Sequence, residues 1–175
     1  MLIRRELPND VDAIRAVQFE AFHRPDLPDP ERVQEADLVD WLRAGDDWIP
    51  ELSLVALDGA GEVVGHVVCS RAYVEDRPVL GLGPLGVRPD HQGRGVGHAL
   101  MHAVLGASDG YGAPAVILLG EPAFYSRFGF EPAGRSGIIA PEPDWGEYFQ
   151  VRRLTTYDDG LRGRCRYAEE FGKLA

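Results

Sequence analysis

The segment Gln92-Gly-Arg-Gly-Val-Gly97 constrains this chain most, because it joins an extended segment to a helix through three glycines at alternate positions. Glycine has no Cβ atom and adopts positive φ readily, so the main chain can turn tightly and approach a ligand. The first N–H groups of a helix lack intrahelical partners and carry partial positive charge. The segment therefore predicts a site for a phosphate or pyrophosphate group, with Arg94 as an added cation.

The residues after the glycines are predicted to form an amphipathic helix. Their apolar members recur with helical spacing and form one stripe, at Val96, Ala99, Leu100, Ala103 and Val104.

Two familiar phosphate-binding loops are excluded by spacing. A nucleotide P-loop needs a lysine directly after its last glycine, and none follows here. The dinucleotide pattern Gly-x-Gly-x-x-Gly would put its third glycine at His98 or at Leu100. The turn therefore belongs to another class of phosphate site.

Two blocks of the sequence resemble the GNAT acyltransferase superfamily. Gln92, Gly95 and Gly97 match its Gln/Arg-x-x-Gly-x-Gly/Ala signature, and residues 124–130, Phe-Tyr-Ser-Arg-Phe-Gly-Phe, resemble its Phe-Tyr-x-x-x-Gly-Phe block. The likeness is strongest to the bacterial YhbS-like branch. It covers roughly residues 2 to 154 and continues more faintly into the tail.

The resemblance implies an α/β (α+β) GNAT fold. Such a fold has a mixed, mostly antiparallel central sheet with a splayed parallel pair and helices on both faces. We expect one N-acetyltransferase domain over residues 1–175, with residues 155–175 as a C-terminal extension that packs against it.

Local patterns place the predicted elements along the chain. One helix should follow Pro8-Asn9-Asp10, and a second should begin at Asp29-Pro30-Glu31 and run to about Arg43. Strands are expected at 2–5, 51–57, 63–70, 77–87 and 116–119, with 148–154 as the last, and a hairpin turn at 58–61. Pro84 and the glycines within 77–87 weaken strand pairing, which leaves room for a ligand.

The implied reaction is acetyl transfer from acetyl-CoA to an amine, on a small molecule, a protein N-terminus or a lysine, by direct attack on the thioester. The alternative is a non-catalytic acyl-CoA-binding or sensing module. The resemblance implies cofactor contacts from Leu85, Gly86, Val87, Gln92, Gly93, Arg94, Gly95, Val96, Gly97 and His98.

Tyr125 is the predicted catalytic residue. A phenol has a pKa near ~10, so Tyr125 is protonated at neutral pH and can donate a proton to the leaving thiolate. An N–H near Val87 could stabilise the oxyanion. The chain also departs from the superfamily pattern, because Gly120-Glu121-Pro122 stands where many members carry a small polar residue just after the fifth strand.

The sequence does not identify the general base. Its candidates are Glu20, His66, Glu75 and Glu121. Acceptor selectivity is expected between Phe19 and Asp29.

The composition of the chain excludes several classes of partner and cofactor. The chain has 175 residues and a formal net charge of −10, which disfavours nucleic-acid binding, and Arg88 and Arg94 would supply a local positive patch for the cofactor phosphates. The two cysteines, Cys69 and Cys165, and the scattered histidines form no metal motif. No apolar run reaches membrane-spanning length, so we expect a cytoplasmic protein without metal, nucleic-acid or membrane partners. A second copy of the chain is a candidate partner, since dimers are common among relatives.

Overall fold

The computed structural model describes residues 1–174 and contains a nine-stranded sheet. Seven strands follow one path across the sheet; of the remaining two, one pairs with β3 and the other pairs with that strand. In path order the seven are β1 (Leu2–Arg5), β2 (Ser53–Leu57), β3 (Val63–Val74), β4 (Arg77–Val87), β5 (Ala115–Leu119), β8 (Phe149–Arg153) and β6 (Glu131–Pro132). The two others are β7 (Ile138–Ile139) and β9 (Gly163–Arg166).

Neighbouring strands along the path are antiparallel except for β4 and β5. These two pair in parallel at two positions only, Leu80 with Val116 and Gly81 with Ile117. Beyond Gly81, β4 continues to Val87 without pairing to β5. The predicted mostly antiparallel sheet with a splayed parallel pair is confirmed.

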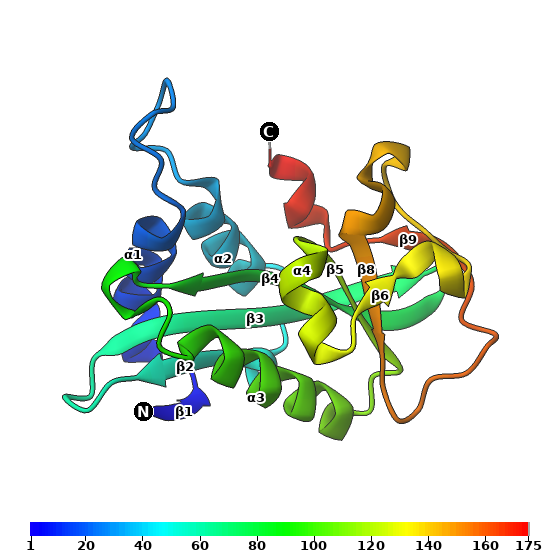
Figure 1. The fold of residues 1–175 in the computed structure, drawn as a ribbon, viewed down its shortest axis with the longest axis horizontal. Helices are drawn as coiled ribbons and strands as arrows, with labels where there is room; N and C mark the ends of the chain where they lie inside the picture. Colours follow the sequence, from blue (N-terminus) through cyan, green and yellow to red (C-terminus); the bar gives the residue numbers. More distant parts are fainter. Residues whose placement is uncertain (175) are drawn as a thin grey trace.

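Helices cover both faces of the sheet, as predicted (Figure 1). Helices α1 (Val11–Phe22) and α2 (Gln34–Ala44) lie on one face, and α3 (Val96–Tyr111) lies on the other. The alternation of strand side chains explains this division. Leu54 and Ala56 belong to the core beneath α3, whereas Val55 packs with Ile14 of α1 and Val39 of α2.

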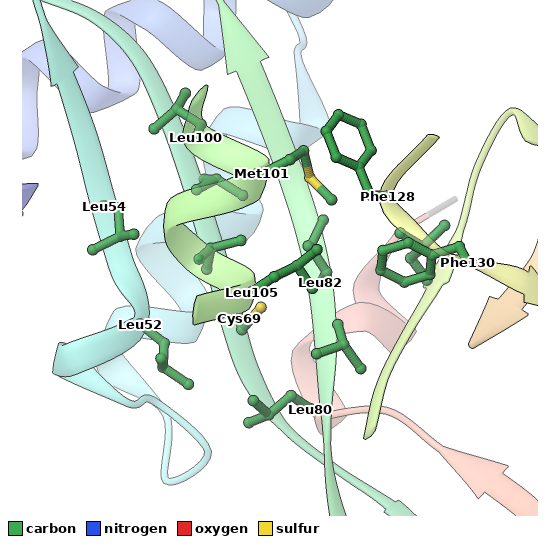
Figure 2. Close-up of a cluster of buried hydrophobic side chains, with 14 of the residues drawn as sticks. Leu52, Leu54, Cys69, Leu80, Leu82, Leu100, Met101, Leu105, Phe128 and Phe130 are labelled. Carbon is green, nitrogen blue, oxygen red and sulfur yellow. The ribbon is translucent and has the colours of Figure 1, made fainter. Parts of the chain in front are cut away.

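The largest core lies between α3 and the sheet (Figure 2). Leu100, Met101 and Val104 of α3 are fully buried in it. Phe128 and Phe130 close its far end, beyond the short helix α4 (Pro122–Tyr125). The two sequence blocks that carry the family resemblance therefore share one core.

Helix α2 begins later than predicted, at Gln34 rather than near Asp29. Val33 is extended and buried, so the chain before Gln34 does not coil. The Nδ1 of His23 also donates to the Pro30 carbonyl oxygen at 3.0 Å, which gives that carbonyl a partner outside a helix. Packing and this contact override the helix-start pattern at 29–31.

Strand β8 is not the last strand, contrary to the prediction. β9 follows it and pairs with β3, where Tyr73 faces Arg166 and Val74 faces Cys165. Four residues that include two arginines give little strand signal, so tertiary pairing determines this element.

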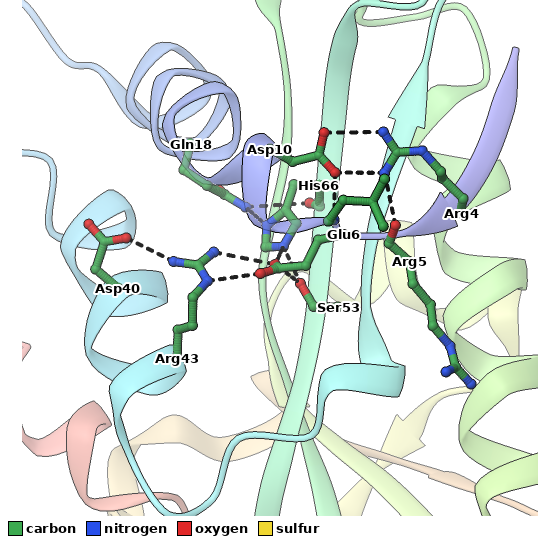
Figure 3. A network of polar contacts seen from close by, with 10 residues as sticks. Arg4, Arg5, Glu6, Asp10, Gln18, Asp40, Arg43, Ser53 and His66 are labelled. Atoms are coloured by element: carbon green, nitrogen blue, oxygen red, sulfur yellow. Dashed lines mark hydrogen bonds and ion pairs between the residues drawn. The ribbon is translucent and has the colours of Figure 1, made fainter.

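A buried polar network joins β1, α1 and α2 beneath the helical face (Figure 3). The Nε of Arg43 donates to Glu6 at 2.8 Å, and the Ser53 hydroxyl also donates to the Glu6 carboxylate. Burial by itself raises the pKa of Glu6, but the contacts with His66, Arg43 and Ser53 outweigh it and lower that pKa to about 2. Glu6 is therefore an ionised anchor for the first strand.

The Glu6 carboxylate should stabilise the fold in a pH-dependent way. Its pKa is lower in the folded chain than in the unfolded one, so its contribution is full above pH 4.5 and is lost as the pH falls toward 2. We expect this loss to reach about 3 kcal/mol in the free energy of unfolding. Glu6→Gln should remove it, as measured by urea denaturation across this range.

Glu51→Gln is the matched control for that measurement, because Glu51 is an exposed carboxylate of η2 (Pro50–Leu52). Its pH profile should follow the unmodified chain. Equal acid sensitivity of Glu6→Gln and the unmodified chain would contradict the role of Glu6 as an anchor.

Candidate functional site

A cavity of about 550 Å³ lies where β4 has separated from β5 and where α3 begins. Its walls come from α1, the end of β4, the glycine turn and the α4 region. The lining residues are Ala21, Phe22, Leu85, Val87, His91, Gln92, Gly93, Gly95, Val96, Gly97, His98, Phe124 and Arg127.

The glycine turn has the backbone geometry that its sequence predicts. Gly93 and Gly95 have φ values of 72° and 84°, which side-chain-bearing residues rarely adopt. The first hydrogen bond of α3 runs from the Ala99 N–H to the Gly95 carbonyl at 3.0 Å. The amides of residues 96–98 precede that bond and so lack intrahelical partners at the cavity wall. This arrangement suits an anion.

The final residues of β4 present a second set of main-chain groups. The N–H of Arg88 donates to the Val64 carbonyl of β3 at 2.9 Å. Because successive residues of a strand point their main-chain groups to opposite edges, Leu85 and Val87 direct theirs away from β3, toward the gap. A ligand in this gap can pair with the main chain of β4.

The side chain of Gln92 has a structural partner. Its amide nitrogen donates to the Val87 carbonyl at 3.0 Å and so ties the glycine turn to the end of β4. The two main-chain surfaces of the cavity are thereby held in register with each other.

Most of the predicted cofactor-binding residues line the cavity, but Gly86 and Arg94 do not. Gly86 lies under the side chain of Gln18, and Arg94 is exposed. The residues that the sequence reasoning did not single out as cofactor contacts are Ala21, Phe22, His91, Phe124 and Arg127. Phe124 and Arg127 lie close to Tyr125 in the block at residues 124–130. Their place in this block could have identified them as cavity residues from the sequence.

Arg88 is held by carboxylates rather than directed at the cavity. Its guanidinium lies 3.4 Å from Glu20, 3.8 Å from Glu62 and 3.3 Å from Asp90. Neither Arg88 nor Arg94, the two arginines expected to form a positive patch, lines the cavity. Arg127 is the arginine that lines it.

Tyr125 lies beside the cavity rather than among its lining residues. Its ring contacts Phe124 edge-on, with centroids 4.9 Å apart, and burial raises the pKa of its hydroxyl. The ring also covers Gly120, where a Cβ would come within 2.4 Å of Tyr125 Cε2. A side chain at position 120 would collide with this ring, so the glycine allows the ring to pack here.

None of the four candidate bases lines the cavity. Glu20 faces Arg88, and Glu75 accepts the Arg164 N–H at 2.6 Å on the turn after β3. Glu121 caps α4 by accepting the Ala123 N–H at 3.4 Å. His66 is fully buried, and burial lowers its pKa. The structure therefore leaves the base unassigned.

Residues 1–174 contain neither a membrane-spanning helix nor a metal-binding cluster. No helix in this part of the chain is long and apolar enough to cross a membrane. No three or more His, Cys, Asp or Glu side chains there are grouped to hold a metal ion.

The splayed strands, the glycine turn and the cavity between them define an acyltransferase of the GNAT type. The pattern of the Acetyltransferase (GNAT) family matches residues 12–130, and the chain belongs to that family.

Two curated relatives are similar over nearly their whole length. The uncharacterized N-acetyltransferase YhbS of Escherichia coli is 38% identical, with 99% of this chain and 100% of the relative covered. The uncharacterized N-acetyltransferase YjhQ of Escherichia coli is 35% identical, with 95% and 92% covered.

Solved structures agree with this assignment. YhbS from Escherichia coli in complex with CoA superposes with a TM-score of 0.86 at 35% identity, over 99% of this chain and 93% of that one. A GNAT family acetyltransferase from Brucella melitensis in complex with acetyl-CoA gives a TM-score of 0.76 at 33% identity, over 97% of each chain.

The contact between Gly120 and Tyr125 predicts a steric effect. Gly120→Ala should force the tyrosine ring to move and lower the free energy of unfolding by about 1–3 kcal/mol, measured by urea denaturation. Gly106→Ala is the control, because a Cβ on this α3 glycine meets no atom within 4 Å. An unchanged stability of Gly120→Ala would show that the ring does not lie on this glycine in solution.

Proposed function

We propose that this chain transfers an acetyl group from acetyl-CoA to an amine acceptor in the cavity beside β4. One observation carries the proposal: the unpaired amides of the glycine turn and the edge of β4 that has no neighbouring strand face the same cavity. A pyrophosphate matches the first surface and an amide-containing pantetheine arm matches the second. The CoA and acetyl-CoA complexes of the two solved relatives support this choice of ligand.

Different residues of the chain bind different parts of the cofactor. The amides of Gly97 and His98 at the start of α3 donate to the pyrophosphate. The main-chain groups of Leu85 and the N–H of Val87, whose carbonyl accepts from Gln92, hydrogen-bond the pantetheine and place the thioester at the gap. Binding a remote part of the cofactor in this way orients its reacting atom.

Tyr125 supplies the proton for the departing thiolate. Burial raises the pKa of Tyr125, so the hydroxyl stays protonated across the neutral range and acts as a donor rather than as a base. Its ring is held by Phe124 and by the contact with Gly120 at the end of β5.

The acceptor enters from the side of α1. Ala21 and Phe22 of the last turn of α1 line the cavity, so the loop that follows α1 borders its mouth. The net charge of −10 favours a cationic amine in the approach to the site.

Gly97→Asp tests the pyrophosphate site without weakening the helix. A Cβ at position 97 meets only Val87 and Phe124, at 3.8 and 3.9 Å, so the side chain fits. A carboxylate in the first turn stabilises a helix by about 0.3–1 kcal/mol but repels a pyrophosphate there. The variant should keep or raise its melting temperature while its Kd for CoA, measured by calorimetry, rises at least about tenfold.

Unchanged CoA affinity in Gly97→Asp would overturn the proposed phosphate site. Gly110→Asp, placed in the same helix but far from its first turn, is the charge-matched control and should bind CoA as the unmodified chain does.

Tyr125→Phe tests the proton donor. It should lower kcat with an amine acceptor by roughly 10²-fold, because a positioned acid contributes at least about that factor. The Kd for acetyl-CoA should stay the same, since the ring contacts remain. A free-thiol assay with a panel of amines measures the rate. Unchanged turnover would remove Tyr125 from the mechanism, and CoA binding without turnover of any amine would favour a non-catalytic acyl-CoA-binding module.

A further inference from the structure

The side chain of Gln18 lies between a buried histidine, His66, and the strand that forms the cavity wall. Figure 3 shows its amide beside His66. Gln18 lies on α1 and is fully buried. Its amide nitrogen is 2.8 Å from His66 Nδ1 and 3.4 Å from the His66 carbonyl oxygen. Its amide oxygen is buried and has no hydrogen-bond partner.

Each group in this network donates a hydrogen bond to the next, in the order Gln18, His66, Ser53 and Glu6. Glu6 is ionised, so the Ser53 hydroxyl must donate to it. The Ser53 oxygen then accepts from His66 Nε2, 2.8 Å away, and the bare Nδ1 accepts from the Gln18 amide. A neutral His66 satisfies every one of these contacts, which leaves the Gln18 oxygen as the unpaired atom at the end of the chain.

That oxygen rests against Gly86. A Cβ on Gly86 would lie 2.5 Å from Gln18 Oε1 and 3.2 Å from Ala21 Cβ, so α1 packs directly on the main chain of β4 here. Gly86 also faces His66 across the β3–β4 ladder. It separates Leu85 from Val87, both of which line the cavity. The Gln18 amide therefore contacts the main chain between these two residues.

We propose that Gln18 is a positioning residue for acetyl transfer: its amide, hydrogen-bonded to His66 and seated on Gly86, holds Leu85 and Val87 where they bind the thioester arm. The inference rests on the proposed role of Leu85 and Val87 in cofactor binding.

Protonation of His66 reverses the orientation of the Gln18 amide. A proton on Nδ1 would face the amide N–H groups of Gln18, which places two donors against each other. The amide then turns so that its oxygen accepts from Nδ1, and its nitrogen with two hydrogens comes to lie on Gly86. The main chain at Gly86 must shift to admit the larger group.

Few charged groups face His66. Glu6, whose carboxylate lies 3.7 Å from Nε2, favours the protonated form, and Arg43 of α2 opposes it. Gln18 of α1, Ser53 of β2 and Gly86 of β4 carry no charge. Burial is the largest influence and lowers the pKa of His66, so the turned amide is reached on acidification.

The test measures the Kd for CoA and the KM for acetyl-CoA in four proteins, from about pH 8 down to the lowest pH at which each chain stays folded, because burial lowers the pKa of His66 below the ordinary histidine value. In the unmodified chain both constants should rise several-fold at the acid end. Gln18→Glu offers a carboxylate to Nδ1–H and should move this rise to higher pH by about one unit. Gln18→Met fills the same space but makes no hydrogen bond to His66. In this variant the Kd and the KM should no longer show the part of their rise at low pH that is due to His66.

Two comparisons make the result specific. Gln18→Met retains the titration of the phosphates of CoA itself, so the difference from the unmodified chain isolates His66. Asp12→Asn removes a charge from the exposed face of α1 and should follow the unmodified chain at every pH.

Identical pH profiles in all four proteins would overturn the role of Gln18, while CoA binding itself would leave the proposed function intact. Failure of the unmodified chain to bind CoA at any pH would overturn both.

Discussion

Strands β4 and β5 are hydrogen-bonded at two residue pairs and then diverge, and the rest of the site depends on this separation. A strand that has lost its neighbour must satisfy its main-chain groups in another way, because unpaired buried amides are costly. On one side β3 continues to pair with β4 as far as Val87. On the other side the same residues face a cavity, so the sheet itself supplies binding groups without any specialised side chain.

Glycines let neighbouring elements approach the strands closely at three points around this gap. Gln18 lies on Gly86, Tyr167 lies on Gly81, and Tyr125 lies on Gly120. In each case a Cβ atom would come within 3 Å of the covering side chain. These glycines do not have positive φ, so their role is close packing rather than turning. The arrangement links α1, the tail and α4 to the strands that border the cavity.

The sequence predicted the parts of the fold that local pattern determines. The start of α3 at Val96 followed from the glycines and the apolar stripe, and β4 has its predicted bounds. The late start of α2 and the existence of β9 depend on burial and pairing between distant segments, which leave little trace in local composition. Among the site residues, the glycine turn was recognisable because its function requires missing side chains. The carboxylates around Arg88 were not, since they come from three separate elements.

The contact of Tyr167 with Gly81 has a consequence for how the molecule is made. Gly81 marks the last paired position before the strands separate, and the ring that covers it follows β9 near the far end of the sequence. During translation, β4 leaves the ribosome long before this cover exists. The contact therefore forms only after residue 167 has been made, so this part of the sheet stays without its covering ring while the preceding elements are synthesised.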